Sequence, residues 1–346
     1  MPFPNSTRSY LAFMKRRTAL AILGTLPFAS IARAQTGGGN DRFEPALRNA
    51  DALSSLKTVI VSVDGNETAS RAYHGAALNG STNIKSASKS IVSALVGIAI
   101  DKKVLDGVEQ PIATVLRSSF PTNPDPRLER VTIGNLLSMQ SGLERMSGPN
   151  YGRWVSSRDW VRTALGSGFA GEPGGGMLYS TGSTHLLSAI LTKASGRSTL
   201  ALAREWFRPL KGFSIGAWER DPQGIYLGGN QMAMTARSLL AFGELYRRGG
   251  VTPDGERLLP QAWIDQSWQQ RTNSVFNGDG YGYCWFIKEM AGEQVYYAWG
   301  YGGQMLYIVP AKKLSVVMTS REDAPSARTG YRDQLHGLMG EIIRAA

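Results

Sequence analysis

The chain has 346 residues, of which 42% are hydrophobic and 19% are charged, so it is long enough to bury a large core and is not expected to be disordered. Its net charge of +11 falls to +6 without residues 1–34, which contain five basic residues and no acidic residue. Because no run of basic residues interleaved with aromatic residues follows, we expect no nucleic-acid partner.

The cysteine and histidine content leaves little room for metal chemistry. Cys284 is the only cysteine, which excludes an internal disulfide and a cysteine-based zinc site. The three histidines, His74, His185 and His336, are scattered and form no HExxH-like motif. We therefore expect no metal and no other cofactor.

Residues 1–34 have the three parts of a signal peptide. A basic segment ends at residues 15–17, an apolar run covers 18–31, and Ala-Arg-Ala at 32–34 precedes the expected cleavage site. The apolar run is shorter than the ~20 residues that span a bilayer as a helix, so a membrane anchor is the weaker alternative. We expect an exported protein, periplasmic or secreted, with no stable membrane anchor after cleavage. The export route and a possible start at Met14 stay open.

The next segments predict a Gly-rich lead and a hairpin. We expect the lead, residues 36–40, to be mobile. The segment 57–63 (KTVIVSV) is typical of a strand, residues 64–66 (DGN) of a turn, and 68–74 of a second strand. From about 84 to 270 the apolar residues mostly repeat with helical spacing, interrupted by prolines and glycines.

The C-terminal part predicts strands followed by a helix. Four segments indicate an antiparallel meander: YGYCWFI (281–287), QVYYAW (294–299), GQMLYIV (303–309) and LSVVMTS (314–320). Apolar residues at helical spacing from Leu335 to Ile343 then predict an amphipathic helix that covers this sheet.

Strands at both ends of the chain, with helices between them, predict an α+β fold. Residues 35–346 would form one domain in which helices flank an antiparallel sheet. The sheet lobe would comprise about 41–80 and 275–346, and an inserted, mostly helical lobe would comprise about 84–270.

Ser86 and Lys89 stand out at the start of a helix predicted over 83–103. Residues three apart lie on one helix face, so the Ser86 hydroxyl and the Lys89 amine can meet. The Ser86 N–H would lie at the helix N-terminus, where negative charge is stabilised. Burial lowers the pKa of a lysine, and a neutral amine can accept a proton from a hydroxyl. Ser-x-x-Lys therefore indicates a nucleophile with its base one turn away.

The same motif also has a purely structural interpretation. Serine is a common helix cap, a lysine in the first turn can extend to solvent, and a motif with two fixed positions often occurs by chance. The helix that follows, however, is apolar on every side from Ile91 to Ile100. Because such a helix is buried all round, Lys89 cannot easily reach water, which favours the catalytic interpretation.

A second serine, Ser214, lies in a GxSxG sequence at residues 212–216. The nucleophile elbow of α/β-hydrolases needs a strand before this motif and a helix after it, then an acid and a histidine. Residues 217–222 start a helix poorly, and the only later histidine, His336, lies in the predicted closing helix. A glycine-rich turn is the favoured interpretation, and the elbow is the alternative.

Beyond the single motif, the chain resembles the serine β-lactamase and penicillin-binding-protein-like hydrolases, in particular their class C-type esterase and 6-aminohexanoate-oligomer-hydrolase-like branch. Four segments carry the resemblance in the family's order: SASKSIVSALVGIAIDKK (86–103), VTIGNLLSMQSGL (131–143), GMLYSTGSTHLLSAILTKASGRS (176–198) and AWGYGGQMLYIVP (298–310). Weaker likenesses extend the coverage to most of residues 55–345.

By this resemblance Ser86 is the acylated nucleophile, Lys89 is its base, and Tyr179 is the phenol that relays a proton to the leaving group. The oxyanion hole would consist of the Ser86 N–H and an N–H from the edge strand of the sheet, which points to Gly302. Tyr179 also has a packing interpretation, and the glycines around position 302 can simply form a tight strand entry.

Two positions depart from the family's pattern. The tyrosine motif commonly reads Tyr-x-Asn, whereas Thr181 here replaces the amide by a hydroxyl. The third motif normally begins with Lys or His, but Trp299 stands at the corresponding place, so we expect no cation there to hold a penicillin-type carboxylate. Both changes disfavour β-lactams and cell-wall peptides as substrates.

We therefore expect an exported serine hydrolase that cleaves small carboxylic esters through an acyl-enzyme. Substrate contacts are expected from Thr181, from Trp299 and Tyr301, and from an apolar wall that includes Tyr151 and Trp154. The alternatives are a hydrolase of linear amides such as 6-aminohexanoate oligomers, a β-lactamase or D-alanyl peptidase, and a ligand-binding protein on the same fold. The intact serine, lysine and tyrosine disfavour the last of these.

Overall fold

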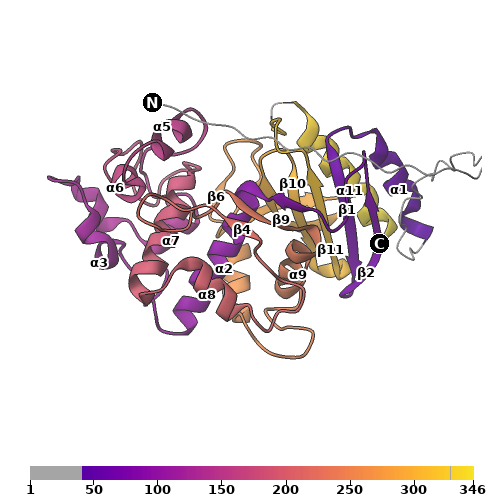
Figure 1. The fold of residues 1–346 in the computed structure, drawn as a ribbon, viewed down its shortest axis with the longest axis horizontal. Coiled ribbons are helices and arrows are strands. Elements are labelled where there is room, and N and C mark those ends of the chain that lie inside the picture. Colours follow the sequence, from indigo (N-terminus) through magenta and orange to yellow (C-terminus); the bar gives the residue numbers. More distant parts are fainter. Residues whose placement is uncertain (1–40, 328) are drawn as a thin grey trace, which may run out of the picture. The chain divides into compact units, whose positions relative to one another are not determined.

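The computed structural model describes residues 41–327 and 329–346 (Figure 1). The expected signal peptide and the Gly-rich lead at 36–40 lie outside these residues. Within residues 41–327 and 329–346, we find no helix that has both the length and the apolar character needed to cross a membrane.

The core of the fold is an antiparallel sheet of eight strands in the order β2-β1-β11-β10-β9-β8-β7-β6. The strands are β1 (Leu56–Val63), β2 (Asn66–Ala72), β6 (Thr272–Asn273), β7 (Gly280–Tyr281), β8 (Phe286–Met290), β9 (Glu293–Gly300), β10 (Gln304–Val309) and β11 (Leu314–Ser320). Every residue of β10 and β11 is buried, because helices cover both faces at the centre of the sheet.

The sheet joins the two ends of the described chain, as the sequence predicted. Strand β1 pairs with β11, and the hydroxyls of Thr58 and Thr319 meet across the pair at 2.6 Å. The β1–β2 hairpin turns at Asp64 and Gly65, which both have positive φ angles (50° and 85°), as in a type I′ turn. The expected α+β class with an antiparallel sheet is confirmed.

Helices α9 (Ala236–Arg247) and α11 (Tyr331–Ala345) pack on this sheet, and the short helix α1 (Glu44–Asn49) precedes β1 in the chain. Helix α11 is the predicted closing helix, and α1 lies against it, so the predicted hairpin does not open the fold. Helix α9 contacts β10, β11 and β1, although it belongs to the segment predicted as the helical lobe. Gly243 allows this close contact, because a Cβ there would lie 2.5 Å from a methyl carbon of Leu306.

The segment between β2 and β6 is mostly helical, as the sequence predicted. It contains α2 (Ser88–Asp101), α3 (Ala113–Leu116), α4 (Ile133–Leu137), α5 (Tyr151–Val155), α6 (Trp160–Leu165), α7 (Thr181–Ser195), α8 (Thr199–Trp206) and α10 (Gln261–Trp268) besides α9. It also holds a small antiparallel sheet that the sequence did not predict, formed by β3 (Ser81–Asn83), β5 (Met232–Thr235) and β4 (Ala217–Trp218) in that order.

The predicted meander is present with one correction. The segment 281–287 is not one strand, because the chain turns back between β7 and β8, where the Gly282 N–H donates to the Trp285 carbonyl at 2.9 Å. Cys284 lies in this turn with a positive φ of 62° and is buried.

Candidate active site

Ser86 lies on a tight turn between β3 and α2. The sequence predicted one helix over 83–103, but β3 ends at Asn83, a 3-10 turn covers Lys85–Ala87, and α2 begins only at Ser88. The reason is local: the Asn83 side-chain oxygen accepts the Lys85 N–H at 2.9 Å and holds Lys85 at a positive φ of 50°. Ser86 therefore lies in this 3-10 turn, two residues before the helix begins.

Lys89 lies in the first turn of α2 with only 1% of its surface exposed. Its Nζ is 3.1 Å from the Ser86 Oγ, 3.2 Å from the Thr181 Oγ1 and 2.6 Å from the Gly229 carbonyl oxygen. Burial lowers the pKa of Lys89 from its usual 10.5 to about 7. When the amine is neutral, two N–H bonds can serve Gly229 and Thr181 while the lone pair faces the Ser86 hydroxyl.

Tyr179 completes the group of three. It is 8% exposed and lies just before α7, and its ring centroid is 5.2 Å from the Lys89 Nζ. Burial raises the pKa of the Tyr179 phenol above its usual value, and a hydrogen bond with the Ser86 side chain lowers it part of the way back. The structure thus brings the three residues predicted as catalytic together, with Lys89 and Tyr179 buried and Ser86 partly exposed.

Thr181, predicted to contact substrate, is the first residue of α7 and faces Lys89. Its N–H donates to the Ser147 Oγ at 2.8 Å, and the two hydroxyls are 3.1 Å apart. The Thr181 hydroxyl is therefore engaged within the protein by Lys89 and Ser147. Ser147 was not predicted from the sequence, since it lies 34 residues from its partner in no motif of its own.

The Gly228-Gly229 loop was also missed by the sequence analysis. Gly229 has a positive φ of 80°, and a Cβ there would lie 2.5 Å from the Lys89 Cγ and 2.4 Å from the Thr184 Oγ1. Only glycine lets this backbone approach the lysine so closely. The two adjacent glycines are visible in the sequence, but no neighbouring residue indicates that this loop contacts Lys89.

A buried histidine and aspartate hold this loop. His185 Nε2 is 3.1 Å from Asp221 Oδ2, and neither side chain has exposed surface. The Gly228 N–H donates to His185 Nδ1 at 3.4 Å. Because Nδ1 accepts, Nε2 must carry the proton that it donates to the carboxylate, which defines the tautomer of the neutral ring. The pair thus fixes the backbone next to the carbonyl that binds Lys89.

The end of β9 lies against the Ser86 turn. A Cβ on Gly300 would lie 2.2 Å from the Ile84 carbonyl oxygen, so the strand approaches this turn closely only because residue 300 is glycine. Gly302 has a positive φ of 84°, and a Cβ there would lie 2.3 Å from the Arg321 carbonyl. The role of Gly302 in an oxyanion hole stays a prediction.

The predicted aromatic residues lie in different surroundings. Trp299 donates its Nε1–H to the Ser326 Oγ at 3.1 Å, and Tyr301 is 48% exposed. The Tyr151 hydroxyl accepts from the Asn230 side chain at 3.0 Å, next to the Gly229 loop. Trp154 is almost fully buried and packs against His185, with ring centroids 5.5 Å apart, so it is part of the core near that histidine.

A cation does lie near Trp299, although none was predicted. The guanidinium carbon of Arg332, in the first turn of α11, is 5.2 Å from the centroid of the Trp299 ring. Two of its nitrogens bind the Asp333 carboxylate, at 3.1 and 2.9 Å, so its charge is paired within the protein.

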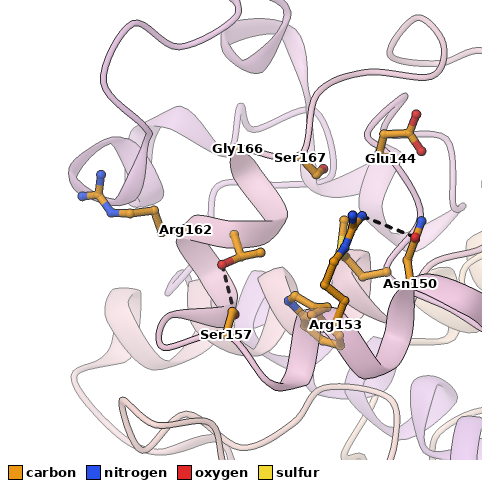
Figure 2. A pocket seen from close by; sticks show the side chains of 10 residues that line it. Glu144, Asn150, Arg153, Ser157, Arg162, Gly166 and Ser167 are labelled. Carbon is orange, nitrogen blue, oxygen red and sulfur yellow. Dashed lines mark hydrogen bonds between the residues drawn. The ribbon is translucent and has the colours of Figure 1, made fainter.

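A separate cavity of about 680 Å³ opens beside α5 and α6 (Figure 2). It is lined by Glu144, Met146, Asn150, Arg153, Trp154, Ser157, Arg162, Thr163, Gly166 and Ser167. Figure 2 shows Arg153 turned toward Asn150 and Arg162 pointing away from both. The Ser157 and Thr163 hydroxyls bond to each other at 3.0 Å. Its lining holds no serine paired with a base, so we place the reactive centre at Ser86.

The rival serine does not stand on an elbow. Ser214 is exposed in the loop before β4, and its N–H and carbonyl both bond to the Ser238 hydroxyl. The strand β4 and not a helix follows it, and His336 lies on α11, where its Nδ1 is 3.0 Å from the Tyr307 hydroxyl. The glycine-rich turn is therefore the correct interpretation of residues 212–216.

Comparison with known proteins places the whole arrangement in a family. The family model described as Beta-lactamase matches residues 56–339. The chain belongs to the beta-lactamase family. A search of curated protein sequences finds no match to this chain.

Several solved structures of beta-lactamase-like proteins share the fold. A Bacillus anthracis protein assigned as a 6-aminohexanoate-dimer hydrolase is 20% identical, with a TM-score of 0.70 over 86% of this chain and 81% of that one. EstCE1, a hydrolase with promiscuous acyltransferase activity, is 18% identical, with a TM-score of 0.70 over 87% and 98%. A penicillin-binding protein homologue from Caulobacter crescentus is 16% identical, with a TM-score of 0.72 over 90% and 99%.

These findings confirm the resemblance seen in the motifs. Since the beta-lactamase family model covers most of the chain, the expected class of serine hydrolase is confirmed as well. The structural relatives are each 20% identical or less, so they establish the fold and leave the substrate to be inferred from the site.

Proposed function

We propose that this beta-lactamase family member hydrolyses carboxylic esters of small molecules through an acyl-enzyme on Ser86. The observation that carries the proposal is the contact between the Ser86 Oγ and the Nζ of a fully buried lysine whose pKa lies near 7. A neutral Lys89 removes the Ser86 proton, and the Ser86 oxygen attacks the ester carbonyl.

The remaining steps use groups around Ser86. The Ser86 N–H and an N–H at the end of β9, for which Gly302 is our candidate, would stabilise the oxyanion. As the carbon–oxygen bond to the alcohol breaks, Tyr179 donates its proton to the leaving oxygen and regains one from Lys89. A water molecule then attacks the acyl carbon and gives up a proton to Lys89. The bond to the Ser86 oxygen breaks, that oxygen takes the proton back from Lys89, and the carboxylic acid leaves.

Two features support an ester over a β-lactam. The Thr181 hydroxyl is engaged by Lys89 and Ser147, so it is poorly available to a substrate amide. The Arg332 charge near Trp299 is paired with Asp333. A substrate that needs both an amide partner and a free cation would leave polar groups unpaired. An ester of a simple alcohol or phenol needs neither.

Covalent labelling tests this proposal. We expect a fluorophosphonate to add one label to the protein, peptide mapping to place it on Ser86, and Ser86→Ala to abolish both the label and turnover of a p-nitrophenyl ester. Ser214→Ala is the matched control and should behave like the parent. Absence of a label on the folded parent would favour the ligand-binding protein, and a label on Ser214 would contradict the site.

We also propose that residues 1–34 direct export, because they combine a basic segment, an apolar run and Ala-Arg-Ala. Expression of the full chain in a Gram-negative host should yield periplasmic protein that begins at about residue 35. A chain lacking residues 1–34 is the control and should stay in the cytoplasm. If the full-length chain also stays there uncleaved, export is contradicted.

A further inference from the structure

Among the described residues few large hydrophobic side chains are exposed, and those few lie on two segments that border the candidate site. Among the described residues, Val275, Phe276 and Tyr301 are the exposed large hydrophobic residues, with 55%, 40% and 48% of their surface accessible. Single exposed apolar residues are normal on protein surfaces. Here, however, Phe276 packs on two residues of the candidate site, and Tyr301 follows the Gly300 that contacts the Ser86 turn.

Phe276 packs directly against Tyr179, one of the three predicted catalytic residues. Its ring stands edge-on to Tyr179, with centroids 5.2 Å apart and planes at 74°. It is also edge-on to Trp299, with centroids 5.7 Å apart and planes at 86°. The Tyr179 ring centroid is 5.2 Å from the Lys89 Nζ, which is 3.1 Å from the Ser86 Oγ, so Phe276 packs against a member of the cluster that contains the nucleophile.

The loop that carries Phe276 is held firmly. The Ser274 N–H donates to the Asp279 carbonyl at 2.7 Å, and the Phe276 N–H donates to the Ser274 hydroxyl at 3.2 Å. Asn277 reaches the Asp279 carboxylate at 2.6 Å and the Tyr297 hydroxyl at 3.1 Å. These bonds hold the apolar ring in contact with water, which is unfavourable. Covering the ring with an apolar partner is therefore favourable.

We propose that Phe276, together with Val275 and Tyr301, forms an apolar collar at the entrance to the Ser86 site and that this collar receives the hydrocarbon part of the substrate. The inference rests on the proposed ester hydrolysis and narrows its substrate class. The preferred substrates are esters whose acyl part or alcohol part carries a hydrocarbon group larger than methyl. A lipid surface is the other occupant for exposed apolar residues, but the packing of Phe276 on Tyr179 and Trp299 places the collar beside the reacting ester.

The collar predicts a dependence on chain length. Moving one methylene group from water into an apolar site raises kcat/KM by at most about fourfold. Since the collar leaves one side of the chain open, we expect kcat/KM to rise by about tenfold from p-nitrophenyl acetate to p-nitrophenyl hexanoate. Phe276→Ser should reduce this ratio to less than about threefold, whereas Phe276→Leu, which keeps an apolar side chain, should retain most of it.

The experiment measures the hexanoate-to-acetate ratio for the parent, Phe276→Ser and Phe276→Leu, with Ser86→Ala as the blank and all esters below their solubility limit. A second series, of acetates with alkyl alcohols of increasing length, tests the alcohol side of the ester. Hydrolysis in this series is measured by titrating the acetic acid that is released. A ratio that depends on Phe276 in either series supports the collar and identifies the side of the ester that it holds.

Equal ratios in the parent and Phe276→Ser in both series would overturn the collar while leaving ester hydrolysis intact. A Phe276 effect that appears only with vesicles of phosphatidylcholine or with ester droplets would overturn it in favour of a lipid surface. If Ser86→Ala remains active, the failure lies in the proposed function itself, so the two proposals can be distinguished.

Discussion

The Lys89 Nζ lies closer to the Gly229 carbonyl oxygen, at 2.6 Å, than to the Ser86 hydroxyl that it is proposed to deprotonate, at 3.1 Å. A carbonyl can only accept, so this bond fixes one N–H of the amine in both of its charge states. The remaining directions of Nζ are left for Thr181 and Ser86. Gly229 therefore orients the base toward the nucleophile.

Gly229→Ala should disrupt this arrangement. The new Cβ would meet the Lys89 Cγ at 2.5 Å, and the position has a positive φ of 80°, so the lysine or the carbonyl must move. We expect kcat/KM to fall by at least about a hundredfold, which corresponds to about 2.7 kcal/mol. Gly224→Ala is the matched control, since Gly224 has a φ of 87° and nothing within 4 Å. Similar losses in both variants would show that backbone strain alone explains the effect.

The rate should increase with pH as Lys89 loses its proton. Because burial lowers the pKa of Lys89 to about 7, kcat/KM for a p-nitrophenyl ester should rise through about pH 7 and then level off. Burial raises the pKa of Tyr179 above its usual 10.0, so the proton donor stays protonated and no decline is expected below about pH 9. A pH–rate profile measured in buffers of constant ionic strength checks both statements, and a flat profile between pH 5 and 9 would contradict the role of Lys89.

Lys89→Met should abolish most of the activity but stabilise the fold. A buried lysine with a lowered pKa takes up a proton more readily when the chain unfolds, so the parent is penalised most below about pH 7 and gains stability as the pH rises toward 10.5. The stability advantage of Lys89→Met should therefore shrink above pH 7, by at most about 1.4 kcal/mol per pH unit. Urea unfolding at pH 6, 7.5 and 9 measures this difference, and an advantage that grows with pH would refute the assignment.

Asp221→Asn should act on the base through the loop. The amide would still accept the Gln223 and Ile225 N–H groups, but it would turn a donor toward His185 Nε2. The ring must then carry its proton on Nδ1, where the Gly228 N–H now needs an acceptor. We expect kcat to fall by at least about tenfold with KM nearly unchanged, because the lysine is displaced and not the substrate. Asp254→Asn, which removes only an exposed pair with Lys211, should leave both constants unchanged.

The substrate preference is testable with two chromogenic compounds. A β-lactam needs a partner for its side-chain amide and a free cation for its carboxylate, and each missing partner costs ~1–3 kcal/mol. We expect kcat/KM for short p-nitrophenyl esters to exceed that for nitrocefin by at least about a hundredfold, with Ser86→Ala as the blank. Comparable values would favour the β-lactamase alternative, and efficient cleavage of a 6-aminohexanoate dimer would favour the linear amidase.

The sequence predicted the parts of the site that depend on local spacing. Ser86 and Lys89 are three residues apart, and the apolar run that follows them accounts for the burial of the lysine. Even here the exact start of the helix was wrong, because one side-chain bond from Asn83 to the Lys85 N–H turns the first residues into a 3-10 turn. Helical periodicity contains no information about such a bond.

The parts that the sequence missed come from distant segments. Gly229 meets Lys89 across 140 positions of the chain, and the small sheet β3-β5-β4 consists of strands of three, four and two residues. A strand so short has no measurable alternation, and a glycine pair in a loop does not indicate what it will contact. Phe276 was missed for the same reason, since only the folded chain shows that its exposed ring packs on Tyr179.

The pairing of β1 with β11 has a consequence for how this protein folds. The two threonines that meet across these strands are 261 positions apart, so the centre of the sheet cannot close until nearly the whole chain is available. Folds dominated by such distant pairings form slowly, since the chain entropy of closing the loop must be overcome first. Before that closure β1 would leave an edge unpaired, and the strand that carries Trp299 and Gly300 could not yet lie against the Ser86 turn. Hydrolytic activity should therefore appear only with the last step of folding, and a chain truncated before Leu314 should remain inactive at every stage.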